Sequence, residues 1–213
     1  MNNSRALVPP ITSDLLFVTP VFRQEWPDDS ELNHYLRKLI LSWERADARS
    51  TGEYSNVGGW HSPIDLHECW DSEIRLVLER CRELASEATT RLLGPAGQSR
   101  RCTYALSAWA NVSRQGDYNV PHVHLSTWSA VYYVSVTPGC ESEQRAGGLE
   151  LLDPRPATAM VDMPGAFFAT RHLIKPHAGL LVLFPASVMH FVHPFRGEGE
   201  RISLACDLTL EPG

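Results

Sequence analysis

Apolar residues recur at helical spacing in two segments of the first half of the chain. The first segment follows Asp29 and Ser30, either of which can cap a helix. Its apolar positions lie three or four residues apart: Leu32, Tyr35, Leu36, Leu39, Ile40 and Trp43. The second segment begins near Asp71 and is stopped by Gly94 and Pro95. The pattern predicts two amphipathic helices and a mostly helical part over about residues 1–97.

The pattern changes after Gly97 to short β-branched and aromatic runs separated by glycine and proline. The runs read TYALSAWANV, WSAVYYVSV, GGLELLD, AFFAT, HAGLLVLFP, MHFVHPF and RISLACDLTL. An earlier run, LLFVTPVFRQEW, predicts a first strand that is interrupted at Pro20. Strands at such close intervals are typical of an antiparallel sandwich or barrel. We therefore expect one α+β domain over residues 1–213, in which the helices brace a β core of about residues 98–211.

Composition narrows the classes of function. Because the net charge is -6 and the isoelectric point is near 5.8, the chain lacks the basic surface that nucleic acid requires. No segment approaches the roughly 20 apolar residues of a membrane span, and the N-terminus lacks the apolar region of a signal peptide. Five scattered cysteines without ligand spacing favour reduced thiols. We expect a cytoplasmic protein that acts on a small molecule, with no nucleic-acid or membrane partner.

Three histidines are candidates for metal binding. His122 and His124 precede the run WSAVYYVSV, and residues i and i+2 of a strand project from the same face, so both imidazoles can reach one ion. Histidines that only form hydrogen bonds at the end of a sheet are the alternative, and the H-x-H pattern alone does not decide between the two. His190 follows the apolar run LLVLF and is the third candidate, because His193 would face the opposite side.

Arg201 and Ser203 lie on one face of the last predicted strand. An arginine fork beside a hydroxyl suits bidentate binding of a carboxylate. A surface salt bridge is the alternative for Arg201, but the apolar run ISLACDL that follows disfavours it.

Taken together, these residues carry a family resemblance. H-x-H, a histidine after 66 to 68 residues and R-x-S a further 11 residues on resemble the 2-oxoglutarate/Fe(II)-dependent oxygenase superfamily. The stretches WANVSRQGDYNVPHVHLSTWSAVYYV, GGLELLDPRP and GLLVLFPASVMHFVHPFRGEGERISL are similar to a bacterial and phage family of such oxygenases. The segment SNVGGWHS, residues 55–62, is similar to that family's upstream signature.

The resemblance implies a double-stranded β-helix, also called a jelly roll, that uses Fe(II), 2-oxoglutarate and O2. His122 and His190 would be iron ligands, and Arg201 and Ser203 would bind the distal carboxylate of 2-oxoglutarate. One position departs from the superfamily, because His124 stands where the usual triad of two histidines and a carboxylate has its carboxylate. We expect His124 to bind the metal, which then has three neutral ligands and one more unit of positive charge than the usual site. Without that ligand an open coordination position would remain. Zinc and copper also suit an all-imidazole site.

Other residues are candidates for contacts with the cosubstrate or substrate. Asn111, on the strand face of Trp109, could donate to a carboxylate or to bound oxygen. Tyr133 could orient 2-oxoglutarate through its hydroxyl, although core packing explains a tyrosine there equally well. The glycine-rich SNVGGWHS segment is either a lid over the site or a tight surface turn.

The leading hypothesis is an oxygenase that oxidises a small molecule or amino-acid-like substrate and releases succinate and CO2. A cupin-type dioxygenase with three histidines and no 2-oxoglutarate also fits the histidines, but it leaves Arg201 and Ser203 without a role. A non-catalytic jelly roll that binds a metal or small ligand is the third hypothesis. The sequence does not distinguish hydroxylation, desaturation, cyclisation and halogenation, and aromatic edge strands could support a homodimer.

Overall fold

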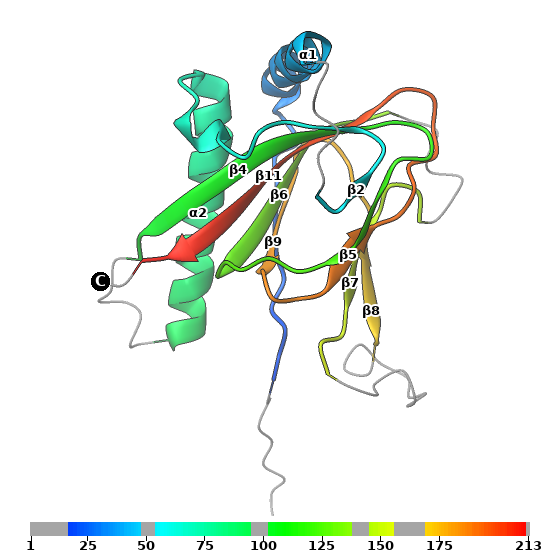
Figure 1. Cartoon of the computed structure of the whole chain (residues 1–213). Coiled ribbons are helices and arrows are strands. Elements are labelled where there is room, and N and C mark those ends of the chain that lie inside the picture. The colour runs from blue at the N-terminus through cyan, green and yellow to red at the C-terminus, as the bar shows by residue number, and fades with distance from the viewer. Residues whose placement is uncertain (1–16, 48–53, 95–101, 138–144, 156–168, 212–213) are drawn as a thin grey trace, which may run out of the picture.

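Two antiparallel sheets stand face to face in a computed structural model of the chain, and helices cover one of them (Figure 1). The structure describes residues 17–47, 54–94, 102–137, 145–155 and 169–211. The larger sheet has the order β1 (Phe22–Glu25), β9 (Leu180–Pro185), β6 (Trp128–Val136), β11 (Arg201–Leu210), β4 (Tyr104–Ser113) and β3 (Trp60–His61). The smaller has the order β2 (Asn56–Val57), β5 (Tyr118–His122), β10 (His190–Val192), β7 (Leu149–Leu152) and β8 (Arg171–Ile174).

The chain winds back and forth between the two sheets. Strands β4, β5, β6 and β7 alternate between the larger and the smaller sheet, and so do β8, β9, β10 and β11. All strand pairs are antiparallel, with β11 central between β6 and β4. This winding is that of a double-stranded β-helix, which confirms the expected α+β jelly roll.

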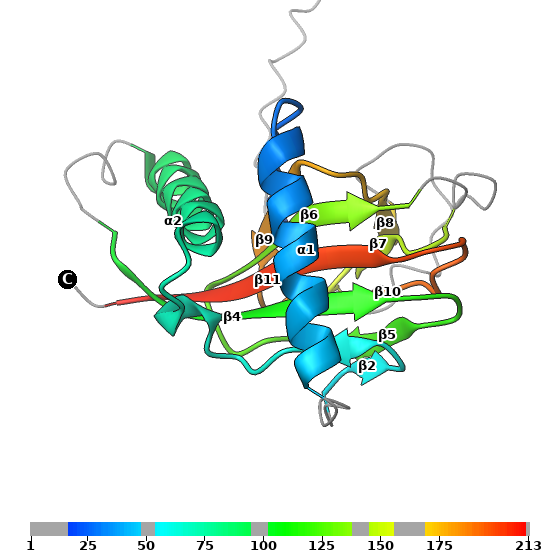
Figure 2. The same cartoon turned by 90° about the horizontal axis from the view of Figure 1, so that it is seen from above.

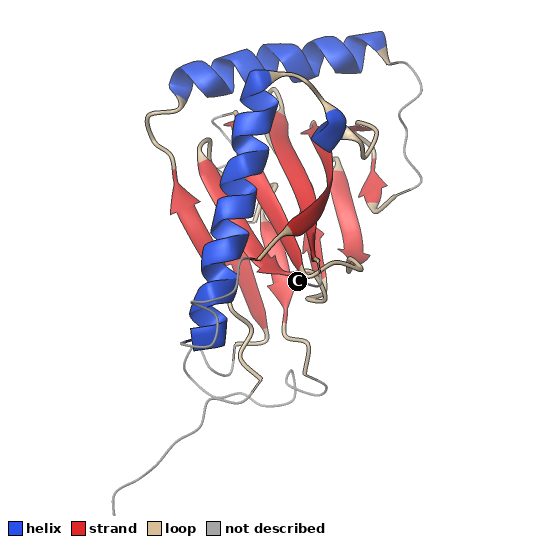
Figure 3. Ribbon diagram, turned by 90° about the vertical axis from the view of Figure 1, so that its left-hand side faces the viewer, coloured by secondary structure: helices blue, strands red, loops and turns tan. Residues whose placement is uncertain are grey.

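Both helices pack on the outer face of the larger sheet (Figures 2 and 3). Helix α1 (Ser30–Ala46) buries Leu36 and Ile40. Helix α2 (Ser72–Leu93) begins after Asp71, whose carboxylate accepts hydrogen bonds from two backbone N–H groups of the first turn, and it ends at Gly94. A short 3-10 helix, η1 (Leu66–Glu68), precedes α2. The two predicted helices are confirmed, and none of the described helices is long and apolar enough to span a bilayer.

Strand alternation divides the larger sheet into a helix-facing side and a side that faces the smaller sheet. Along β4, Ala108 and Ala110 join the core beneath the helices, while Trp109 faces the space between the sheets. The tyrosine pair of β6 separates in the same way. Tyr132 donates from its hydroxyl to Asp29 and Asn33 on the helix side, and Tyr133 faces the inter-sheet space. The face of the larger sheet that points toward the smaller sheet therefore carries the polar residues of the pocket, among them Asn111, Arg201 and Ser203.

Several strand predictions need correction or lie outside the described residues. The first strand begins only after Pro20, and AFFAT falls partly on residues 166–168, which the structure does not describe. Besides the predicted first strand, β1, the N-terminal part also contains the two short strands β2 and β3, which were not predicted. Most relevant to the site, β5 ends at His122, so His124 lies beyond the strand and does not share its face by simple alternation.

Candidate active site

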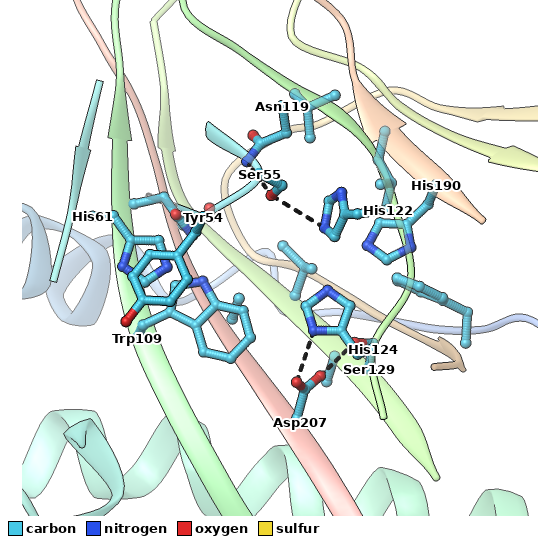
Figure 4. Close-up of a pocket in the computed structure, with 18 of the residues that line it drawn as sticks. Tyr54, Ser55, His61, Trp109, Asn119, His122, His124, Ser129, His190 and Asp207 are labelled. Carbon is cyan, nitrogen blue, oxygen red and sulfur yellow. Dashed lines mark hydrogen bonds and ion pairs between the residues drawn. The ribbon is translucent and has the colours of Figure 1, made fainter. Parts of the chain in front are cut away.

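A pocket of about 420 Å³ opens between the two sheets, and His122, His124 and His190 meet in it (Figure 4). His122 is the last residue of β5 and His190 the first of β10. The two residues are direct partners in the β5–β10 pair, and their ring centroids lie 4.2 Å apart. His124 reaches the same place from the loop after β5, where its backbone N–H donates to the carbonyl of Ala186 at 2.9 Å. The structure thus brings together all three predicted histidines.

Each of the three imidazoles forms a hydrogen bond through Nδ1, and His122 Nε2 also lies 3.3 Å from the Ser55 hydroxyl. His122 Nδ1 lies 2.7 Å from the Val120 carbonyl oxygen, and His190 Nδ1 lies 2.9 Å from that of Val188. His124 Nδ1 lies 2.7 Å from a carboxylate oxygen of Asp207. Because these oxygens only accept, each Nδ1 carries a proton, and in a neutral ring Nε2 then keeps a lone pair.

The geometry of the histidines fits a metal ion. One ligand atom from each ring lies within 4.8 Å of those of the other two. Burial lowers the pKa of His190 to about 3, and the neighbouring His122 adds to the effect. Burial likewise lowers the pKa of His122. Both rings are therefore neutral near pH 7, which is the state that binds a metal.

At another part of the pocket, buried donors have no partner. Arg201 and Ser203, on β11, are almost fully buried and line the pocket, and Asn111 lies opposite Ser203 on β4. Arg201 Nε and the Tyr133 hydroxyl are buried without a hydrogen-bond partner among the described residues. A buried donor without a partner costs about 1–3 kcal/mol. These donors therefore indicate an anionic ligand with carboxylate-like acceptors.

A row of rings forms another wall of the pocket (Figure 4). Tyr54 stacks on His61 with centroids 4.6 Å apart, His61 lies parallel to Trp109 at 5.6 Å, and Trp109 lies parallel to His124 at 5.7 Å. Burial lowers the pKa of His61, so this wall is uncharged near pH 7. Trp109 and Asn111 both line the pocket, as their predicted common strand face requires, whereas Tyr54 lies outside every predicted element and could not be found from the pattern.

The SNVGGWHS segment is a tight turn rather than a free lid. Gly58 and Gly59 have φ angles of 70° and 67° and connect β2 of the smaller sheet to β3 of the larger. Before this turn, the Ser55 hydroxyl accepts a hydrogen bond from Asn119 Nδ2 at 3.1 Å and lies 3.3 Å from His122 Nε2. The segment therefore forms a fixed wall of the pocket.

Asp207 is the residue that sequence reasoning missed. It lies on β11 six residues after Arg201, on the same inward face, and it accepts hydrogen bonds from His124 and from Ser129 (Figure 4). Strand alternation from Arg201 and Ser203 could have placed it in the site. By contrast, His193 lies outside the pocket lining and bonds to Glu150, in line with its exclusion from the predicted metal site.

Comparisons with known proteins bear on the family and the fold of the chain. Residues 107–207 match the model of a family described as "Putative 2OG-Fe(II) oxygenase". No curated protein sequence matches the chain. A prolyl-4-hydroxylase structure from Pseudomonas putida is 18% identical, with a TM-score of 0.58 over 90% of this chain and 93% of that one.

Two further solved structures share the fold. A prolyl hydroxylase from Trichoplax adhaerens, in complex with a hypoxia inducible factor peptide fragment, is 14% identical, with a TM-score of 0.59 over 89% of this chain and 83% of that one. HygX from Streptomyces hygroscopicus, with nickel and 2-oxoglutarate bound, is 13% identical, with a TM-score of 0.56 over 90% and 83% of the two chains.

The jelly roll and the family match together indicate a 2-oxoglutarate/Fe(II)-dependent oxygenase, a class of enzyme that uses Fe(II), 2-oxoglutarate and O2. The match covers residues 107–207, just under half of the chain.

Proposed function

We propose that the chain oxidises a C–H bond of a small molecule or an amino-acid-like substrate, with conversion of 2-oxoglutarate and O2 to succinate and CO2. The observation that carries the proposal is the pair of buried donors on Arg201 and Tyr133 that lack a hydrogen-bond partner among the described residues, in the same pocket as three converging imidazoles. A site that bound only a metal would have no use for a buried Arg201 Nε that lacks a hydrogen-bond partner among the described residues.

The three histidines would bind the metal through Nε2. Their Nδ1 protons are committed to Val120, Val188 and Asp207, so the rings cannot turn without breaking a hydrogen bond. Iron, when bound with 2-oxoglutarate and oxygen, supplies the oxidising chemistry. The protein's task at this end is to present three imidazole ligands in a fixed arrangement and to limit access of water.

Arg201 would bind the distal carboxylate of 2-oxoglutarate. Its guanidinium carbon lies 5.0 Å from the centre of the Tyr133 ring, and both side chains are buried. The Tyr133 and Ser203 hydroxyls and the Asn111 amide can donate to the same ligand. Because this end is dry, a charge-assisted pair formed there is stronger than one formed in water.

The substrate would enter beside the wall formed by Tyr54, His61 and Trp109. The pocket of about 420 Å³ must also contain 2-oxoglutarate, so the remaining space suits one small molecule or one side chain. Two of the similar structures are prolyl hydroxylases, one of them with a bound peptide, which supports an amino-acid-like substrate.

The test is anaerobic reconstitution with Fe(II) followed by addition of 2-oxoglutarate. We expect a weak visible charge-transfer band in the wild type that is lost in His122→Ala and in His190→Ala. His177→Ala is the control, because His177 is exposed and bonds to Glu25 outside the pocket. Metal binding without the band, and oxygen uptake without succinate, would instead support a three-histidine dioxygenase. Metal binding with no oxygen uptake at all would support a structural site.

A further inference from the structure

The carboxylate of Asp207 is fixed by two strands of the larger sheet. Asp207 on β11 and Ser129 on β6 are direct partners in the strand register. The Ser129 hydroxyl, on a residue that is 4% exposed, donates to Asp207 Oδ1 at 2.6 Å. The other oxygen, Oδ2, accepts from His124 Nδ1 at 2.7 Å. Both oxygens therefore have a partner, and the direction of the His124 hydrogen bond is fixed from the sheet.

His124 depends on this carboxylate in a way that the other two histidines do not. His122 and His190 each bond to a backbone carbonyl two residues earlier, at Val120 and Val188. Val120 belongs to β5 and Val188 lies in the short connection before β10, so both acceptors are in the same local segment as the histidine that they fix. His124 lies in the loop after β5 and does not bond to the backbone carbonyl two residues earlier, which would be that of His122. Its ring instead donates to the side chain of Asp207, 83 positions away in the sequence.

This acceptor also restores a charge to the site. The usual facial triad has a carboxylate where this chain has His124, and three imidazoles alone are neutral. Here the carboxylate of Asp207 accepts a hydrogen bond from His124, the imidazole that stands in place of the usual carboxylate ligand. A carboxylate bonded to a metal-binding histidine fixes its tautomer and raises its basicity, and the loss of such a partner typically weakens metal binding by about 10–100-fold.

We propose that Asp207, fixed by Ser129, is a positioning residue that orients His124 toward the metal and supplies the negative charge that the missing carboxylate ligand would have supplied. The proposal rests on the proposed function in one respect, because it requires His124 to be a metal ligand.

The experiment is a calorimetric titration of the metal-free protein with Co(II) alone. Asp207→Asn preserves the shape of the side chain and removes its charge, and we expect it to weaken Co(II) binding by about 10–100-fold. Ser129→Ala leaves the carboxylate in place and should weaken binding by less than about 10-fold. Ser107→Ala is the matched control, because Ser107 is the β4 partner of Asp207 and lines the same pocket but forms no hydrogen bond with any of the three histidines. We expect its affinity to equal that of the wild type.

A double-mutant cycle separates positioning from a general effect on the fold. In the His124→Ala background, Asp207→Asn should weaken Co(II) binding no further, because the residue acts through His124. The proposal is overturned if Asp207→Asn binds Co(II) like the wild type, or if it weakens the His124→Ala variant by the same factor as the wild type. If Asp207→Asn does not fold, the same cycle is run with Ser129→Ala, whose effect must likewise vanish without His124. A wild type that binds no Co(II), or that binds Co(II) but not 2-oxoglutarate, would instead contradict the proposed function.

Discussion

His122 and His190 are paired residues of adjacent antiparallel strands, and their imidazole rings lie 4.2 Å apart between centroids. The register of β5 and β10 thus brings together two of the three candidate metal ligands. The same pairing places two bases in a mostly dry environment, where a charge on either ring is unfavourable. The strand register therefore favours the neutral form of His122 and His190, which is the form that binds a metal.

The first prediction concerns the stability of the metal-free protein at mildly acidic pH. Burial lowers the pKa of His190 to about 3 in the folded state, whereas it is about 6.5 in the unfolded chain. Between these values the unfolded chain binds a proton that the folded protein does not, so stability falls as the pH falls through about 6 toward 4. His190 alone contributes up to about 1.4 kcal/mol per pH unit. Urea unfolding of chelator-treated protein at several pH values measures the slope.

The matched pair for this measurement is His190→Gln and His177→Gln. The first variant removes the buried base and should flatten the slope, whereas the second changes an exposed histidine and should leave it as in the wild type. Equal slopes in the wild type and His190→Gln would show that His190 titrates normally and contradict the prediction.

Much of the fold follows from local patterns, and the reason is physical. The helical spacing of α1 and α2 and the strand runs of β4, β6 and β11 each record which face is buried, so the sequence alone places them. Strands β2 and β3 have two residues each, too short for any period. Strand β8 is RHLI, which lacks the alternation of a half-buried strand, and its register is set by β7.

The candidate site was predictable where it lies on strands and unpredictable where tertiary contacts create it. Arg201 and Ser203 follow from alternation along one strand, and the structure places both in the pocket. His124 reaches the other histidines for a different reason from the one expected, because the chain has already left β5 and is fixed by Ala186. Its bond to Asp207 joins two distant segments that carry no common local signal.

A second prediction separates binding of the cosubstrate from binding of the metal. Arg201→Lys keeps the charge but loses the planar fork, so affinity for 2-oxoglutarate should fall by about 10–100-fold. Tyr133→Phe removes one uncharged donor and should cost about 2–10-fold. Titration of 2-oxoglutarate into Co(II)-loaded protein measures both effects. Co(II) affinity itself should be unchanged in both variants, and the exposed Arg196→Ala is the control. An unchanged 2-oxoglutarate affinity in Arg201→Lys would remove Arg201 from the proposed cosubstrate site.

A third prediction uses Trp109 as a reporter of the metal. Its ring lies parallel to that of His124 with centroids 5.7 Å apart, so an open-shell ion bound to His124 should quench its fluorescence. Titration of the metal-free wild type with Co(II) should therefore lower tryptophan emission. Trp109→Phe should lose most of this quenching while binding Co(II) normally. Trp70→Phe is the control, because Trp70 is 89% exposed and lies outside this pocket. Quenching that persists in Trp109→Phe would place the ion away from His124.

The last prediction tests the turn that joins the two sheets beside the pocket. Gly59 has a φ of 67°, and a Cβ there would lie 2.7 Å from the Val112 backbone carbonyl oxygen, which cannot move without disturbing β4. Gly116 also has a positive φ, 92°, but a Cβ there would meet nothing within 4 Å. Gly116→Ala should therefore cost only the left-handed conformation, about 1–2 kcal/mol, and Gly59→Ala should cost clearly more, about 2–4 kcal/mol.

Urea unfolding of the metal-free variants measures the difference in stability between Gly59→Ala and Gly116→Ala. The position of the turn predicts a second effect, on metal binding. Because β2 and β3 follow each other directly through the turn, a shift at Gly59 displaces both Ser55, near His122, and His61, in the aromatic wall. Gly59→Ala should thus also weaken Co(II) binding, while Gly116→Ala should not. Equal losses of stability in the two variants would mean that β4 yields to the new methyl group, and that the turn does not fix this side of the pocket.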